Sequence, residues 1–357
     1  MKERIERLRE KLDQENLDLL LVTSLTNIRY LCGYTGSNGI LLISKDKAVF
    51  LTDFRYKEQV KKEVRGAEIK IPQKELFSFL PEIDLLKEKR IKAGFEQRYL
   101  TFQLYQRLKT LLPQVLWVPI ENIVESLLVT KDKEEIKKIK KAADISAKSF
   151  QEILPLFRPG TKESDIAAEL EYRIKKNGGA GSPFEPIVAS GLRSAMPHAR
   201  ASSKILKKGE FVTLDFGAIY DGYVCDITRT VVLGRATPRQ KKIYNLVLKA
   251  QTRAIASARS GMKGFELDKV GRDIIKKAGF EKYFGHGLGH GIGLLVHDSP
   301  GVGTKSQEVL KPGMVITIEP GVYIPGWGGV RIEDDVVITR NGCKVLTHID
   351  KKLLELS

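Results

Sequence analysis

The stretch LKKGEFVTLDFG at residues 206–217 returns as LKPGMVITIEPG at residues 310–321, displaced by a constant 104 positions. Leucine, lysine, glycine, threonine and the last glycine are identical, and an acid holds the same place in each copy, Asp215 and Glu319. Each copy runs on to a second acid and a β-rich segment: Asp226 before ITRTVVL, and Glu333 before DDVVIT. A duplication kept only for packing would not need an acid at the repeated position. The pattern therefore predicts two related strand-turn-strand units that carry functional carboxylates.

The first unit contains a strong hairpin signal, because Asp221-Gly222 is a favoured two-residue turn between β-rich runs. Folding there pairs Asp215 with Thr228 and puts Asp226 on the same face, diagonally and roughly 7–8 Å away. Two carboxylates at that separation repel each other, and burial among apolar neighbours raises the cost. A bound cation offsets both costs. The alternative for this hairpin alone is a pair of acids on a solvated face.

The second unit adds Glu319 and Glu333, with Arg331 two residues before the latter on the same strand face. Four carboxylates and one histidine form a largely oxygen-donor set. Such a set favours Mn²⁺ or Co²⁺ over zinc bound by thiolates, and the sequence contains no closely spaced pair of cysteines that could form a zinc site. Five protein ligands exceed the need of one ion and suit two ions that activate a shared water.

The segment FGHGLGHGIGLLVH at residues 284–297 holds three of the chain's five histidines, with glycine at every second position from 285 to 293. So many glycines exclude a helix, since each costs about 1 kcal/mol there. An extended segment is expected instead, with one bare edge for close backbone approach. Alternation would place His286, Leu288, His290 and Ile292 on the other face. Since four strand residues span roughly 13 Å, at most one of the first two histidines can bind a compact metal centre directly.

Two domains are expected along the 357 residues. The first third alternates helix and strand, with a helix over Glu3–Glu15 followed by strand-like LDLLLVTS, GILLIS and KAVFLTD. A long amphipathic helix begins near Asp132, and a second helix, capped by Thr161, stops before Gly178. The expected domains are an α/β domain at 1–124 and an α+β domain at 125–357.

Composition excludes several classes of protein. The N-terminus has no apolar signal-peptide core, and no apolar run is long enough to span a membrane. Cys32, Cys225 and Cys343 are widely spaced and odd in number, which indicates a reducing, cytoplasmic setting. Lysine and arginine outnumber acids by 60 to 44, giving a net charge of +16. The lysines alternate with glutamates on helix faces without a nucleic-acid motif, so no nucleic-acid partner is expected.

Four motifs in this order resemble the metallopeptidases with the pita-bread fold: methionine aminopeptidase, aminopeptidase P and prolidase. The motifs are VTLDFGAIYDGYVCDITRT, FGHGLGHGIGLLVHD, ITIEPGVY and GVRIEDD. The segments YTGSNG and TDFRY resemble the creatinase/prolidase N-terminal domain, which methionine aminopeptidases lack. The resemblance implies an α/β N-terminal domain, a pita-bread catalytic domain with an internal pseudo-repeat, and membership of the proline-directed branch.

The resemblance also implies a role for each site residue. The metal ligands would be Asp215, Asp226, His290, Glu319 and Glu333, with Asp226 and Glu333 bridging two ions. His297 would polarise the scissile carbonyl, His198 would contact the substrate near the scissile amide, and Glu319 would also shuttle a proton. His286 would contact the metal ligands without binding an ion itself, and Arg331 would orient a ligand carboxylate.

Two proline-directed activities fit this resemblance. A dipeptidase needs a cation for the free carboxylate of its substrate, and similar prolidases often carry arginine just after the HDxP segment. Here that place is Gly301, with Lys305 four residues on, which favours an Xaa-Pro aminopeptidase over the alternative, an Xaa-Pro dipeptidase. A non-catalytic binding module or a metal-independent hydrolase is disfavoured, since all five ligands and both substrate histidines are present. Peptides with proline at the second position are the expected partners, and the family implies a homodimer.

Overall fold

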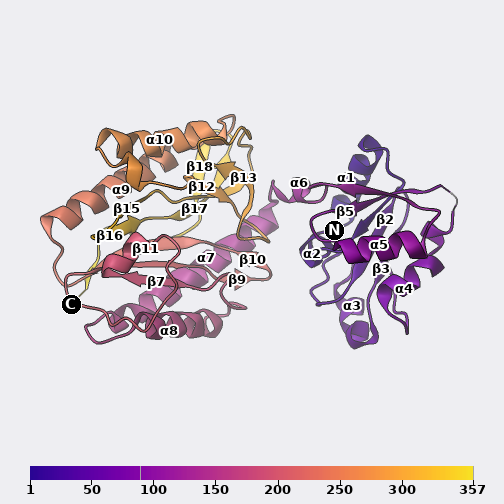
Figure 1. The fold of residues 1–357 in the computed structure, drawn as a ribbon, viewed down its shortest axis with the longest axis horizontal. Helices are drawn as coiled ribbons and strands as arrows, with labels where there is room; N and C mark the ends of the chain where they lie inside the picture. Colours follow the sequence, from indigo (N-terminus) through magenta and orange to yellow (C-terminus); the bar gives the residue numbers. More distant parts are fainter. Residues whose placement is uncertain (89, 357) are drawn as a thin grey trace. The chain divides into compact units, whose positions relative to one another are not determined.

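The computed structural model describes residues 1–88 and 90–356, which divide into two compact units, Met1–Leu128 and Val129–Ser357 (Figure 1). The division falls four residues after the boundary expected from the sequence. Helix α6 (Glu125–Leu128) belongs to the first unit because Glu125 accepts a hydrogen bond from Asn27 and the Leu127 carbonyl accepts one from Tyr30. Among the described residues, the structure contains no helix that combines the length and the apolar character needed to cross a bilayer.

The first unit is a six-stranded mixed sheet with the order β4-β3-β2-β1-β5-β6. Its strands are β1 (Leu19–Val22), β2 (Ile40–Ser44), β3 (Ala48–Leu51), β4 (Glu68–Lys70), β5 (Lys92–Glu96) and β6 (Leu116–Ile120). Its other helices are α1 (Lys2–Gln14), α2 (Leu25–Cys32), α3 (Lys57–Glu63), α4 (Leu76–Phe79) and α5 (Phe102–Leu111). The central strands β1, β2 and β3 are buried at every residue, as expected for aliphatic strands covered on both faces.

The second unit opens with the long helix α7 (Lys133–Ile153), whose capping box joins Asp132 and Glu135. Helix α8 (Glu163–Lys176) follows, and its N-cap is Lys162. The expected cap, Thr161, is therefore wrong by one residue, because the Thr161 carbonyl instead accepts a hydrogen bond from the Leu206 amide. Two further helices, α9 (Pro238–Ser257) and α10 (Gly264–Lys277), come later in the chain.

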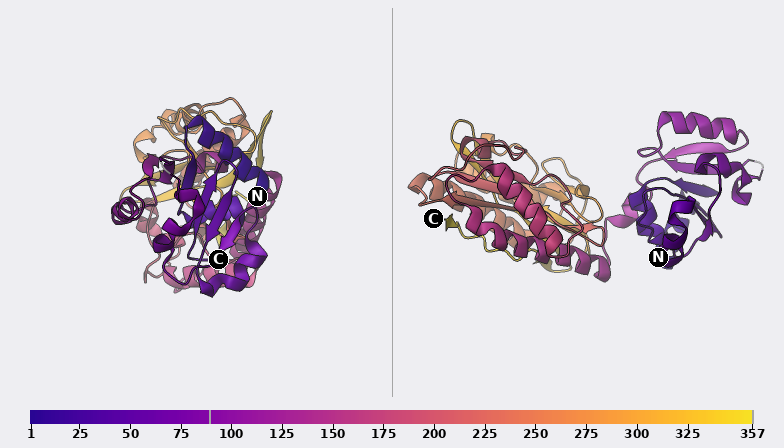
Figure 2. Two further views of the ribbon diagram at one scale, coloured as in Figure 1. Left: turned by 90° about the vertical axis from the view of Figure 1, so that its right-hand side faces the viewer. Right: turned by 90° about the horizontal axis from the view of Figure 1, so that it is seen from below.

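Two main sheets lie between these helix pairs, with the orders β19-β11-β8-β7 and β13-β12-β14-β17-β18. The four-stranded sheet comprises β7 (Ile187–Ser190), β8 (Phe211–Phe216), β11 (Ile227–Leu233) and β19 (Glu355–Leu356). The five-stranded sheet comprises β12 (Gly289–Gly291), β13 (Asp298–Val302), β14 (Val315–Ile318), β17 (Asp334–Thr339) and β18 (Gly342–Val345). One core joins α7 and α8 to the first sheet, and another joins α9 and α10 to the second. Seen from below, α7 and α8 lie in front of the strands (Figure 2).

The repeated sequence forms two matching hairpins. The first runs from β8 through β9 (Ile219–Tyr220) and β10 (Tyr223–Val224) to β11, and the second runs from β14 through β15 (Gly321–Ile324) and β16 (Gly328–Arg331) to β17. The predicted pairing of Asp215 with Thr228 is confirmed. At the predicted turn, Asp221 and Gly222 both have positive φ, 46° and 76°, as a type I′ turn requires.

The glycine-rich segment is extended over only three residues, Gly289–Gly291, so the prediction of one shared face for residues 286, 288, 290 and 292 is wrong. Leu288 is fully buried against α10, whereas His290 faces a cavity. The glycines allow close strand packing. A Cβ on Gly289 would lie 2.1 Å from the Thr317 carbonyl oxygen, and one on Gly291 would lie 2.1 Å from that of Ser299.

Candidate active site

A cavity of about 460 Å³ opens between the two hairpins and the glycine-rich segment in the second unit. This volume lies in the range of small-molecule sites. All nine residues predicted for the site line it: Asp215, Asp226, His290, Glu319, Glu333, His198, His297, His286 and Arg331. Phe184, Glu185, Ile187, Pro197, Arg200 and Val296 form much of the remaining wall.

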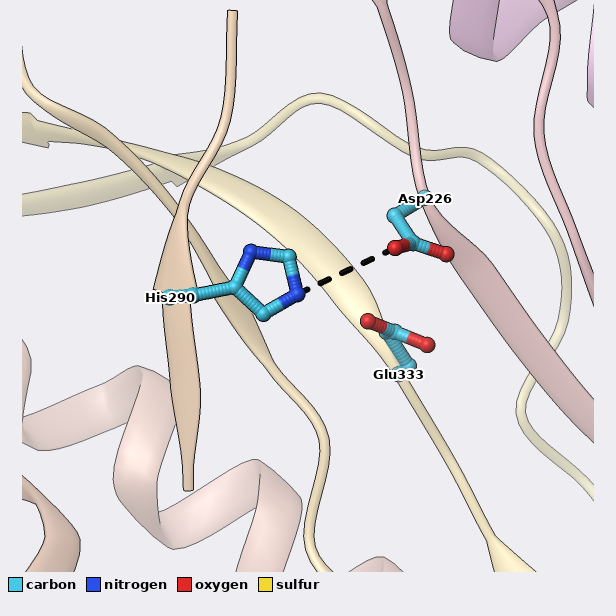
Figure 3. Close-up of side chains that lie close together, drawn as sticks. All are labelled: Asp226, His290 and Glu333. Carbon is cyan, nitrogen blue, oxygen red and sulfur yellow. Dashed lines mark ion pairs between the residues drawn. The ribbon is translucent and has the colours of Figure 1, made fainter. Parts of the chain in front are cut away.

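Three of the predicted metal ligands converge closely. One atom each from Asp226, His290 and Glu333 can be chosen so that all lie within 4.8 Å of one another (Figure 3). The His290 Nε2 atom lies 3.9 Å from Asp226 Oδ2 and 3.5 Å from Glu319 Oε1. The other ring nitrogen, Nδ1, lies 3.0 Å from the Gly291 carbonyl oxygen, which holds a proton on Nδ1 and leaves Nε2 as the acceptor facing the acids.

Two carboxylate oxygens of this cluster have no protein donor, which suits the binding of a cation. Asp215 Oδ1 and Asp226 Oδ1 are buried and have no hydrogen-bond partner among the described residues. A buried acceptor without a donor costs about 1–3 kcal/mol, and more when it is charged. Every donor atom in the set is a carboxylate oxygen or an imidazole nitrogen, which suits a divalent ion.

The electrostatics of the cluster agree with that fit. Burial raises the pKa of Asp226 and of Glu333 well above the ordinary values, and neighbouring carboxylates raise both further. Burial also raises the pKa of Glu319 to about 8 and lowers the pKa of His290 to about 4. These shifts all disfavour the charged forms in a site without a cation.

The two hairpins brace each other through hydrogen bonds to the acids. Arg331, from the second hairpin, binds Asp215 of the first, with 2.5 Å between Nη2 and Oδ2. Thr228, from the first, donates to Glu333 of the second over 2.5 Å and accepts from Arg331 Nε over 3.0 Å. Each hairpin therefore orients a carboxylate that belongs to the other.

Comparison with protein-family models matches residues 137–340 to Metallopeptidase family M24 and residues 4–127 to the Creatinase/Prolidase N-terminal domain. The chain belongs to the M24 metallopeptidase family. It is therefore a metallo-exopeptidase with the pita-bread fold expected from the sequence, and M24 enzymes use divalent metals.

Three relatives cover nearly the whole M24 chain. It is 39% identical to the Xaa-Pro dipeptidase of Pyrococcus furiosus, over 99% of this chain and 100% of that one. The solved Xaa-Pro dipeptidase from Bacillus anthracis has a TM-score of 0.96 and 45% identity, covering 99% of both chains. The X-Pro aminopeptidase from Thermotoga maritima has a TM-score of 0.91 and 36% identity, covering 96% of this chain and 99% of that one.

His286 lines the cavity of this M24 enzyme without approaching the acids directly. Its Nδ1 lies 2.8 Å from the Gly287 carbonyl oxygen and its Nε2 lies 3.0 Å from the Tyr323 hydroxyl. Burial lowers the pKa of His286 to about 4, so the ring is neutral at pH 7 and its Nε2 accepts a hydrogen bond from the Tyr323 hydroxyl. Tyr323 in turn accepts a hydrogen bond from Arg331 over 2.7 Å.

The remaining two histidines lie at the cavity mouth and are exposed. The His297 ring centroid lies 4.4 Å from that of His290. Next to His297, Asp298 forms a buried ion pair with Lys131, with 3.0 Å between Oδ2 and Nζ, which fixes this segment to the start of α7. His198 belongs to the loop after β7.

Sequence reasoning missed Thr228, Tyr323 and Thr317. Thr228 could have been found, because it lies opposite Asp215 in the predicted register. Thr317 donates to Glu319 over 3.3 Å and accepts from the His290 amide over 3.1 Å, and it occupies the repeated threonine of the two copies. Tyr323 carried no signal, because a tyrosine beside a glycine-rich turn most often only packs.

Proposed function

We propose that this chain is an Xaa-Pro dipeptidase, which hydrolyses the bond between an N-terminal residue and a following proline. The convergence of four carboxylates and His290 in one cavity carries the proposal. Relatives of full length named Xaa-Pro dipeptidase favour this activity over the aminopeptidase that Gly301 suggested. The Thermotoga relative keeps Xaa-Pro aminopeptidase as the second candidate.

The proposed ligands of two divalent ions, Mn²⁺ or Co²⁺, are Asp215, Asp226, His290, Glu319 and Glu333. The unpartnered oxygens of Asp215 and Asp226 support this assignment. When bound, such ions polarise a carbonyl and lower the pKa of water. Asp226 and Glu333 are the proposed bridging residues.

The chain's own residues would bind the substrate and move protons. Glu319 would accept a proton and pass it on, and its Oε1 lies 3.5 Å from His290 Nε2 within the acidic cluster. His297 donates a hydrogen bond to the oxygen of the scissile carbonyl, and His198 contacts the substrate beside the amide. Arg331 holds Asp215 in place, and Tyr323 and His286 hold Arg331.

Proline at the second position removes the N–H of the scissile amide, so the enzyme must act without that donor. The cavity walls offer apolar side chains for a pyrrolidine ring at Phe184, Ile187, Pro197 and Val296. A cytoplasmic location and a homodimer stay predictions from the sequence.

The deciding experiment compares an Xaa-Pro dipeptide with an Xaa-Pro-Xaa tripeptide at equal concentration, using manganese-loaded protein and a chelated control. Faster dipeptide cleavage is expected. Faster tripeptide cleavage would make the chain an aminopeptidase. Equal cleavage with and without chelator would overturn the metal-dependent mechanism.

A further inference from the structure

The cavity described above contains no assigned partner for the free carboxylate of a dipeptide. We propose that Arg200 binds this carboxylate and thereby sets a preference for dipeptides over longer peptides. The proposal rests on the proposed peptidase function and identifies which end of the substrate the cavity wall recognises.

The cation suggested by the sequence does not serve this purpose. Lys305 is exposed and is not among the residues that line the cavity. The position that holds arginine in similar prolidases is Gly301, whose amide donates to Glu308 over 3.0 Å. A carboxylate in the cavity therefore needs its cation from another segment.

Only two of the cavity-lining residues are lysine or arginine, Arg200 and Arg331. Arg331 is buried and uses all three of its nitrogens within the protein. Its Nε binds Thr228, its Nη2 binds Asp215, and its Nη1 binds Tyr323 and the Pro197 carbonyl. These bonds hold the buried Arg331 against Asp215 and Tyr323, whereas the exposed guanidinium of Arg200 is accessible to a ligand.

The backbone at Arg200 is held by a buried carboxylate. Arg193 donates from Nη2 to the Arg200 carbonyl oxygen and from Nε to Glu163 over 2.9 Å. Glu163 is fully buried and also accepts from the amides of Ser190 and Ser202, over 2.8 and 3.2 Å. This clamp fixes the backbone of the loop that carries both His198 and Arg200.

The Arg200 guanidinium is exposed and forms one ion pair within the protein. Its Nε lies 3.3 Å from Glu185 Oε2, while the side chain stays 84% exposed. Among the described residues, no other ion pair is present on this side chain, so its two Nη groups can form the paired hydrogen bonds that a carboxylate accepts.

The reach of Arg200 is compatible with a dipeptide. Arg200 follows His198 by two residues, which span at most roughly 7 Å, so its long side chain can reach a group close to the scissile amide that His198 is proposed to contact. In an Xaa-Pro dipeptide the carboxylate lies one residue beyond that amide, roughly 3.5 Å further along the chain. A tripeptide moves its carboxylate another residue away and replaces it with a neutral amide.

The test uses the manganese-loaded full chain with an Xaa-Pro dipeptide and the matching Xaa-Pro amide. Arg200→Gln is expected to lower kcat/KM for the free acid by about 10- to 100-fold, since a charged hydrogen-bonding partner is lost. Its effect on the amide should stay below about threefold, and Arg200→Lys should recover part of the loss. Lys305→Gln and Arg253→Gln, an exposed arginine of α9 outside the cavity lining, should change neither rate.

A binding measurement separates this inference from the proposed function. Calorimetry should give tighter binding of proline than of prolinamide to the wild-type protein, and Arg200→Gln should erase the difference. An unchanged acid-to-amide ratio in Arg200→Gln, or a loss seen only in Lys305→Gln, would overturn the role of Arg200. A wild-type protein that cleaves neither substrate overturns the proposed function itself, whatever the calorimetry gives.

Discussion

Two clusters of buried acids, one in each unit, differ in how their oxygens are satisfied. In the first unit, Glu96 accepts from the amides of Thr23 and Ser24 over 2.7 and 2.8 Å, and from Asn27 Nδ2 over 2.5 Å. In the second unit, the buried Oδ1 atoms of Asp215 and Asp226 have no donor among the described residues. Both carboxylate oxygens of Glu96 therefore have protein donors, whereas the Oδ1 atoms of Asp215 and Asp226 have none.

This difference teaches which observation marks a metal site. Burial raises the pKa of Glu96 to about 7 and that of Glu319 to about 8, so raised pKa values occur in both clusters. The Glu96 cluster bonds its carboxylate oxygens internally, whereas the second cluster leaves oxygens bare beside a cavity. Unpartnered carboxylate oxygens on residues that line a cavity, and not shifted pKa values, separate the two clusters. Asp335 Oδ1 is also unpartnered, but Asp335 lies outside the cavity lining.

Asp226→Asn gives the largest expected effect and removes one bare oxygen. We expect kcat/KM to fall at least 100-fold, because even residues behind a metal's ligands typically cost about 10- to 100-fold. Without metal the variant should be at least as heat-stable as wild type, since one charge leaves a like-charged buried cluster. Asp221→Asn, on the exposed turn of the same hairpin, is the control and should keep full activity. Near-normal turnover by Asp226→Asn would contradict the dinuclear assignment.

Metal removal should destabilise the second unit and leave the stability of the first unit unchanged. At a Mn²⁺ concentration 100 times Kd, binding stabilises the fold by about 2.7 kcal/mol. Hydrogen exchange should therefore speed up on chelation in β8, β11, β14 and β17, while β1 and β2 stay unchanged. An equal change in both units would show that the comparison of the clusters is wrong.

Glu96→Gln tests the cluster around Glu96 in the first unit. In the wild-type protein the folded-state pKa of Glu96, about 7, lies above the ordinary value of 4.5. The stabilising contribution of Glu96 is therefore full below pH 4.5 and is lost as the pH rises through 7. The wild-type first unit should lose about 2–3 kcal/mol of unfolding free energy between pH 5 and pH 8, and the variant should not. Urea unfolding followed by Trp117 fluorescence in a Trp327→Phe background isolates this unit. An identical pH dependence in the variant would show that a group other than Glu96 causes the loss of unfolding free energy.

Tyr323→Phe gives the smallest expected effect, because it changes only how Arg331 is held. The variant loses one of the two acceptors of Arg331 Nη1 and the partner of His286 Nε2. We expect a decrease of about tenfold in kcat/KM, with weaker Mn²⁺ binding as the cause. Titration of the metal-free variant with Mn²⁺ checks this, and unchanged metal affinity with a lower Tm would leave Tyr323 a purely structural role.

Much of the fold and site followed from local patterns. The turn at Asp221-Gly222 fixes the register of the first hairpin, and the repeat then carries the same reasoning to Glu319 and Glu333. Resemblance to M24 enzymes added His198 and His297, which spacing alone could not assign.

Other features depend on contacts between distant segments and have no local signature. The bond from Thr228 to Glu333 joins residues 105 positions apart, and the bond from Arg193 to Glu163 joins residues 30 positions apart. The glycine-rich segment misled the face prediction for Leu288, since its backbone is extended only where β13 and β14 flank it. The absence of arginine at Gly301 favoured an aminopeptidase, whereas relatives that match nearly the whole chain are named Xaa-Pro dipeptidases.

The hydrogen bonds between the two hairpins also determine when the site can form during translation. Asp226 leaves the ribosome long before its partner Glu333, and at about 5–20 residues per second the interval is roughly 5–20 s. Throughout that interval the first hairpin has neither Arg331 nor Glu333 beside it. The first unit can fold as soon as it emerges, whereas the metal centre is completed only when synthesis is almost finished.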